Sequence, residues 1–94
     1  MVQQQKNKYG PWTKRQYERR TEVLYSKGFT RREAGWHAKS PHKLNSKVFR
    51  QEFKMRVEDL EDLRMEQPDY TQKQITEHFN EILDFEHPTD ERYP

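Results

Sequence analysis

The chain has 94 residues, of which 30% are hydrophobic and 36% are charged. This length fits one domain with a thin core, and twelve aromatic residues (five Phe, five Tyr and two Trp) argue for a compact centre despite a composition close to that of disordered chains. The lack of cysteine excludes disulfides, thiolate zinc sites and thiol nucleophiles, and no apolar run is long enough to span a membrane.

Charge is divided unevenly along the chain. Residues 1–56 hold fifteen Lys or Arg and four Glu, a net charge of 15 − 4 = +11, whereas residues 57–94 hold three Lys or Arg and twelve Asp or Glu, a net charge of 3 − 12 = −9. The sum returns the overall charge of +2. This division predicts a basic binding surface followed by an acidic arm or tail, unless the two halves simply neutralise each other on folding.

The chain begins with a polar segment and then becomes helical. Residues 1–11 end in Gly10-Pro11, which breaks regular structure, and we expect them to form a flexible basic arm. Residues 12–85 are expected to form a single helical domain. Its first helix is predicted at 13–27, with Thr13 as N-cap and Gly28 just past the end, because apolar and aromatic residues recur at helical spacing within it.

A second, short helix is predicted at 31–39. Thr30 and Glu33 match a capping box, in which each side chain accepts a hydrogen bond from the other residue's backbone N–H. Ser40-Pro41 ends the helix. Gly35 in its interior costs about 1 kcal/mol relative to Ala, so we expect another part of the chain to approach closely there.

A long third helix is predicted at 46–67, capped by Asn45 or Ser46. Its expected core stripe is Phe49, Phe53, Val57, Leu60 and Leu63. The first turns are basic and the last turns are acidic, which is the order that the helix dipole disfavours. This arrangement indicates that the order of basic and acidic residues along the helix serves a requirement other than helix stability.

A fourth helix is predicted at 71–85, where Thr71 and Gln74 match a second capping box. Ile75, Phe79 and Ile82 should form its buried stripe, and residues 86–94 are expected to be an acidic tail. We favour packing of this stripe against the third helix as an antiparallel pair. Two alternatives stay open, namely an arm that binds a partner and an acidic mask over the basic half. The predicted fold class is therefore all-α, a small bundle of three to four helices.

The middle of the chain has the outline of a helix-turn-helix. Residues 28–56, and in particular Gly28-Phe29-Thr30-Arg31-Arg32-Glu33-Ala34 and Asn45-Ser46-Lys47-Val48-Phe49-Arg50, resemble the helix-turn-helix modules of transcription regulators and of the small DNA-packaging (terminase) subunits of phages. The resemblance implies that the second helix of the motif enters the major groove. The segment between Ser40 and Asn45 is longer than the usual turn and lacks its glycine.

The candidate nucleic-acid-binding residues divide by role. Five are expected to reach base edges, because Arg and Lys can pair with guanine and Asn with adenine, and they are Lys43, Asn45, Ser46, Lys47 and Arg50. Four are expected to hold phosphates, which supply most of the affinity, and they are Arg31, Arg32, Lys39 and Lys54. The alternative is a bundle with a solvated basic face and no groove insertion.

No catalytic or metal-binding arrangement is recognisable in the sequence. The four histidines are scattered without the i, i+4 pair of a helical zinc site, and the carboxylates of residues 58–62 point in different directions on a helix. We therefore expect no enzyme activity, no cofactor and no small-molecule substrate. Trp36 is expected to pack under the first helix or against Trp12, and stacking on a base is the alternative.

Two functions from different classes fit these observations. The first is a small nucleic-acid-binding accessory protein of regulatory or DNA-packaging type, with duplex DNA as the expected partner. The second is a protein–protein interaction or assembly module, such as a small viral structural protein or host-factor-binding adaptor, that docks on an acidic protein surface. No signal segment is visible, so we expect the cytoplasm, the nucleus or a virion and not secretion. The sequence leaves homo-oligomer formation open.

Overall fold

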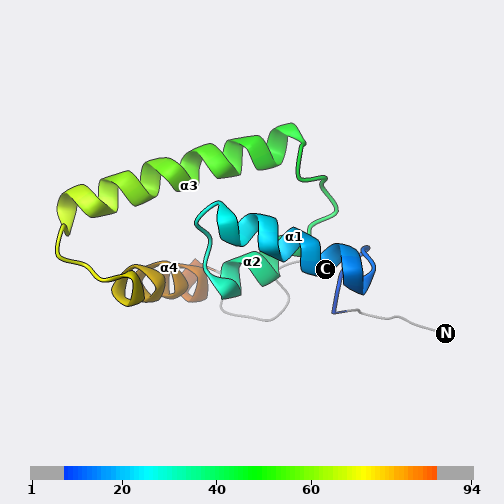
Figure 1. Ribbon diagram of the computed structural model, residues 1–94, viewed down its shortest axis with the longest axis horizontal. Helices are drawn as coiled ribbons and strands as arrows, with labels where there is room; N and C mark the ends of the chain where they lie inside the picture. Colours follow the sequence, from blue (N-terminus) through cyan, green and yellow to red (C-terminus); the bar gives the residue numbers. More distant parts are fainter. Residues whose placement is uncertain (1–7, 87–94) are drawn as a thin grey trace.

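The computed structural model describes residues 8–86, which form four α-helices and no strands (Figure 1). The helices are α1 (Lys14–Ser26), α2 (Arg31–Ala38), α3 (Lys47–Glu66) and α4 (Gln72–Glu86). The prediction of an all-α fold is confirmed, and each boundary lies within one residue of the predicted one. The expected tail after residue 86 and residues 1–7 of the expected arm lie outside the described residues.

Side-chain caps explain why the helices begin where they do. Thr13 and Thr30 each accept a hydrogen bond from the backbone N–H three residues later, and the side chains of Gln16 and Glu33 accept from the backbone N–H of the two threonines in return. The same reciprocal pair joins Thr71 and Gln74 before α4. These contacts satisfy N–H groups that have no partner within the helix, which fixes the first turn.

The first part of the core joins α1, α2 and the start of α3. Its buried members are Leu24, Phe29, Ala34, Ala38 and Phe49, with Phe53 and Leu44 packed against them. The close approach expected at the glycine of α2 is confirmed, because a Cβ on Gly35 would lie 3.2 Å from the hydroxyl oxygen of Tyr17. The same hydroxyl donates a hydrogen bond to the Gly35 carbonyl at 3.3 Å.

The second part of the core joins the far half of α3 to α4. Leu63, Ile75 and Phe79 are buried together, and Leu60 packs against them. The two helices run in opposite directions at this end of the molecule (Figure 1). The predicted packing of the fourth helix on the third is therefore confirmed for the second half of α3.

Two positions in the predicted core stripes are wrong. Val57 is 50% exposed, and its place in the core of α3 is taken by Arg56. Ile82 is 40% exposed, whereas Leu83 is buried. In α3 the buried positions follow each other at alternating steps of four and three residues, which keeps them on one side of a helix. Val57 lies about 80° around the helix from the middle of that side.

Arg56 crosses the core as half of a buried ion pair with Glu33 of α2. Its guanidinium carbon lies 4.6 Å from the ring centroid of Phe29 and 3.8 Å from that of Phe79. An arginine can be buried in this way because its charge is paired and its flat surface stacks on aromatic rings. The contact joins α2, α3 and α4.

None of the helices in the described range 8–86 is both long enough and apolar enough to cross a membrane.

Candidate nucleic-acid interface

The linker between α2 and α3 is held by Arg20 of α1, which is buried. Its guanidinium donates hydrogen bonds of 2.9 Å to the backbone carbonyls of Ala38, Ser40 and His42. The Trp12 ring covers the guanidinium, whose carbon lies 4.1 Å from the ring centroid. The indole N–H of Trp12 donates a hydrogen bond of 2.7 Å to the Ser40 carbonyl. Burial lowers the pKa of Arg20 from its ordinary value. These contacts fix the linker and hence the start of α3.

The turn before α1 packs on the same region. Tyr9 lies with its ring centroid 5.2 Å from that of Tyr17, and Trp12 donates its backbone N–H to the Tyr9 carbonyl. Gly10 has a φ of +62°, and a Cβ there would lie 2.5 Å from the Lys39 carbonyl oxygen. Residues 8–11, inside the range expected to be an arm, therefore form a turn that contacts the end of α2.

The first half of α3 presents a cationic face, which we define as Lys47, Arg50 and Lys54. All three side chains are exposed, and their spacing of three and four residues places them on one side of the helix. That side is turned away from the buried Phe49 and Arg56. None of the three forms an ion pair with a carboxylate of residues 8–86. They are free to meet an external anion.

The remaining candidate residues fall into two groups. Lys43 and Asn45 are exposed in the linker and Lys39 is half-buried at the end of α2, so these three lead into the cationic face. Ser46 caps α3 by accepting from the Phe49 N–H.

Arg31 and Arg32 lie at the opposite end of α2. Arg32 forms an ion pair with Asp84 of α4, which raises the pKa of the arginine above its ordinary value.

Charge along α3 changes sign near its middle. The cationic face occupies the first two turns, and the exposed Glu58, Glu61 and Asp62 follow further along the helix. At about 1.5 Å per residue, α3 spans about 30 Å, which is several times the screening length of about 8 Å at physiological salt. The basic part of α3 lies at the end of the molecule near α1, and the acidic part lies near α4 (Figure 1). An anion at Lys47, at the start of α3, is thus largely screened from the carboxylates near the end of the helix, whereas Lys54 lies only about 6 Å along the axis from Glu58.

The helix–linker–helix that resembles a helix-turn-helix has a long connection. Residues 39–46 separate α2 from α3, which makes eight residues in place of the usual three or four. Arg20 and Trp12 from outside the motif stabilise this linker. The sequence contained no obvious signal for this role, because Arg20 is a charged residue at a core position of α1.

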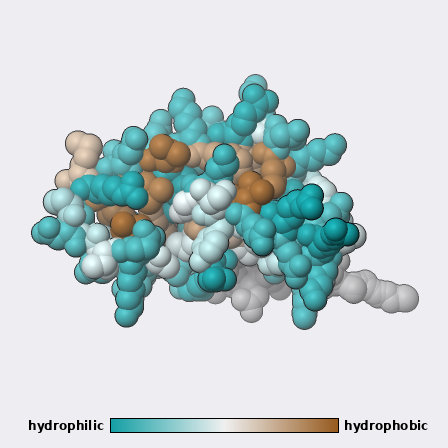
Figure 2. Space-filling model, in the orientation of Figure 1, coloured by the Kyte–Doolittle hydropathy of each residue, from teal (hydrophilic) through white to brown (hydrophobic). Residues whose placement is uncertain are grey.

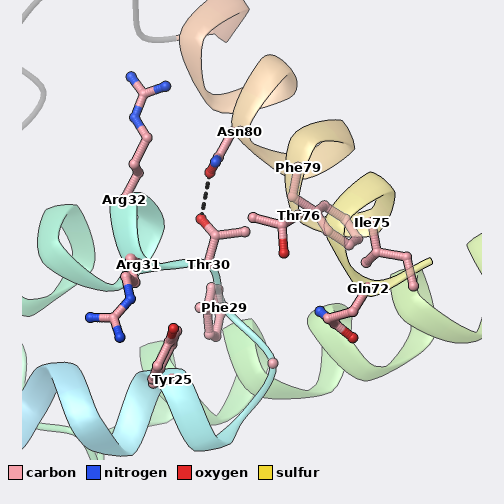
Figure 3. Close-up of a pocket in the computed structure, with 11 residues that line it drawn as sticks. Tyr25, Phe29, Thr30, Arg31, Arg32, Gln72, Ile75, Thr76, Phe79 and Asn80 are labelled. Atoms are coloured by element: carbon pink, nitrogen blue, oxygen red, sulfur yellow. Dashed lines mark hydrogen bonds between the residues drawn. The ribbon is translucent and has the colours of Figure 1, made fainter. Parts of the chain in front are cut away.

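A cleft lies between α2 and α4, and sequence reasoning missed it. We call it the α2–α4 cleft, and its volume is about 540 Å³. Figure 3 shows Tyr25 and Arg31 on one side and Gln72 and Thr76 of α4 on the other, while a hydrogen bond of 2.6 Å from Thr30 to Asn80 joins the two sides. A signal was present, since polar uncharged residues recur every four positions in α4 beside its apolar stripe.

A second, smaller groove of about 380 Å³ lies between α2, α3 and α4. Trp36 is half-buried and lines this groove with Met55 and Ile82, which is not the expected packing under α1 or against Trp12. Met55 is 47% exposed. Figure 2 shows that hydrophobic side chains gather over part of the molecular face, among hydrophilic ones.

Among residues 8–86, no group of three His, Asp or Glu side chains is placed to hold a metal ion. Comparisons of the chain with protein-family models, with curated proteins and with solved structures return no match.

Proposed function

We propose that the chain is a small non-enzymatic nucleic-acid-binding protein of regulatory or packaging type that binds duplex DNA through the first half of α3. The observation that carries this proposal is the cationic face, whose three side chains are exposed, lie on one side of a helix and have no carboxylate partner within residues 8–86. Cations in this arrangement neutralise phosphates and release counterions, which supplies sequence-independent affinity.

The linker supports the same proposal. Lys43 and Asn45 precede the cationic face and extend the polar surface at the N-terminal end of α3. In helix-turn-helix proteins this end of the second helix meets the bases. Arg20 holds the linker backbone as far as His42 through three hydrogen bonds, so the path of the chain that leads to these side chains is set before DNA arrives. A fixed surface loses less conformational entropy on binding.

A salt-titrated mobility shift with duplex DNA tests the proposal. The affinity should fall with salt at a log–log slope of about −0.9 for each phosphate neutralised. The combined variant Lys47→Gln, Arg50→Gln and Lys54→Gln should bind more weakly, and its slope should be shallower by up to about 3.

The matched control is Arg64→Gln, which removes one exposed cation from the acidic half of the same helix. This control should bind as the unmodified chain does. Equal weakening by Arg50→Gln and Arg64→Gln would show that binding depends on overall charge and not on the cationic face. Absence of binding at low salt would remove the proposal.

A second candidate function, a protein–protein interaction module, is supported by exposed apolar side chains on α3 and α4. Phe85 is 87% exposed and Met65 is 81% exposed, while Met55 and Ile82 border the smaller groove. Exposed apolar surface of this kind is typical of interaction sites when it is contiguous. Capture of a stoichiometric protein partner that survives nuclease treatment, and its loss in Phe85→Ser and Met55→Ser, would favour this function.

A further inference from the structure

The α2–α4 cleft has the composition of a ligand site. Its floor is apolar, because Phe29, Ile75 and Phe79 are buried beneath it. None of the eleven residues that line it, all within the described part of the chain, carries a carboxylate. Its volume of about 540 Å³ falls within the range of roughly 300–1,000 Å³ that is typical of small-molecule sites.

Arg31 supplies the positive charge of the cleft. Its side chain is exposed, and its guanidinium carbon lies 5.0 Å from the ring centroid of Tyr25. Arg32 is already paired with Asp84, and in Figure 3 it points away from the cleft. Arg31 is therefore the cation that a bound anion would meet, and phosphate is an anion that an arginine fork binds well.

The opposite wall is a row of uncharged polar side chains from α4. Gln72, Thr76 and Asn80 follow each other at intervals of four residues and so lie on one side of the helix. The Asn80 oxygen accepts from Thr30, whereas the Gln72 amide has no hydrogen-bond partner among residues 8–86. A free amide offers a donor beside an acceptor, which matches the edge of an adenine.

We propose that the α2–α4 cleft binds a nucleotide with an unpaired base. The phosphate is held by Arg31, the base lies over the apolar floor beside the half-exposed Tyr25 ring, and the Gln72 amide pairs with the edge of the base. The nucleotide is either free or part of a single strand, since both present the same groups. This site goes beyond the proposed function, because no residue of α3 lines the cleft.

The test is a titration of the isotope-labelled full chain, followed through its backbone amide NMR signals. The probes are adenosine monophosphate, a short oligo-deoxyadenylate and a blunt duplex. Amide shifts at Thr30, Gln72 and Thr76 are expected with the first two probes. Arg31→Gln should weaken binding by about tenfold, because it removes a charge-assisted contact to phosphate, whereas Arg64→Gln should leave it unchanged.

A cleft-filling variant checks the location independently of charge. Thr76→Tyr should abolish the shifts while circular dichroism still shows the helices. Binding of the oligonucleotide alone would identify a strand as the source, and equal binding of the mononucleotide would identify a free nucleotide. Shifts confined to α3 would overturn the proposal. The absence of shifts with both adenosine monophosphate and the oligo-deoxyadenylate would also overturn it.

Nucleotide binding in the α2–α4 cleft can be tested separately from duplex binding by the cationic face. The combined variant of Lys47, Arg50 and Lys54 should bind duplex DNA more weakly and keep the nucleotide shifts. Loss of nucleotide binding in that variant would overturn the assignment to the cleft.

Discussion

Arg56 and Glu33 bury opposite charges in a core that has few apolar residues. Removing one partner of such a pair leaves the other charge buried without compensation, which is strongly destabilising. The guanidinium also fills the space between the rings of Phe29 and Phe79. The pair therefore determines how α2, α3 and α4 meet.

We expect Glu33→Gln to lower the free energy of unfolding by about 3 kcal/mol, because it leaves the Arg56 charge unpaired in the core. Urea denaturation followed by circular dichroism measures this change. Replacing both residues, as in Glu33→Leu with Arg56→Met, should cost less than the single change. The matched control is the exposed pair, where Arg32→Gln should cost less than about 1 kcal/mol. Equal losses at the two pairs would contradict the structural role of the buried one.

Tyr17 connects stability to pH. Burial, and secondarily the nearby Tyr9, raise the pKa of its phenol above the ordinary value of 10.0. A raised pKa means that the folded state favours the protonated form. The contribution to stability is thus complete below pH 10.0 and is lost as the pH rises through the folded-state pKa. Urea denaturation below and above that pH should show that the free energy of unfolding falls as the pH rises. The Tyr17→Phe variant should show a smaller fall over the same pH range.

At the scale of elements, α3 has a charge order that opposes its dipole. Lys47 stands in the first turn, where a negative charge would be favoured. The proposed DNA binding offers a reason for this order, since the N-terminal end of a recognition helix lies in the groove, where cations meet base edges and the neighbouring phosphates. The cost to helix stability and the gain in binding should then be separable by mutation.

We expect Lys47→Glu to raise the free energy of unfolding by about 0.3–1 kcal/mol while it weakens duplex DNA binding. Position 54 lies beyond the first turn of α3, so Lys54→Glu should weaken duplex DNA binding without raising the free energy of unfolding. Thermal unfolding of the two variants measures their stability, and mobility shifts measure their affinity for duplex DNA. A Lys47→Glu protein that is more stable and binds DNA unchanged would separate the charge order from nucleic-acid binding.

At the scale of the whole molecule, the charges on α3 and α4 give the chain a basic end and an acidic end. The overall charge is only +2, so repulsion between copies is weak. Attraction between the basic end of one copy and the acidic end of another is screened by salt.

We therefore expect sedimentation velocity to show reversible self-association in low-salt buffer and a monomer in high-salt buffer. The combined variant of the cationic face should associate less, and Arg64→Gln should behave as the unmodified chain does. A sedimentation coefficient that does not change with salt would contradict this expectation.

The helices and their starting points were determined by the sequence itself, because caps such as Thr30 with Glu33 act between residues three apart. The spacing of Phe49, Phe53 and Leu63 likewise places them on one helix face, and all three contribute to the core. Local interactions of this kind need no knowledge of the rest of the chain.

Only the tertiary structure decided which charged residues are available. Arg20 and Arg56 count among the cations of the basic half, yet both are buried because carbonyls, a carboxylate and aromatic rings from distant segments surround them. The α2–α4 cleft likewise exists because residues some fifty positions apart, such as Thr30 and Asn80, are brought together. Such contacts depend on how the helices pack, and helix packing is not encoded within any one segment.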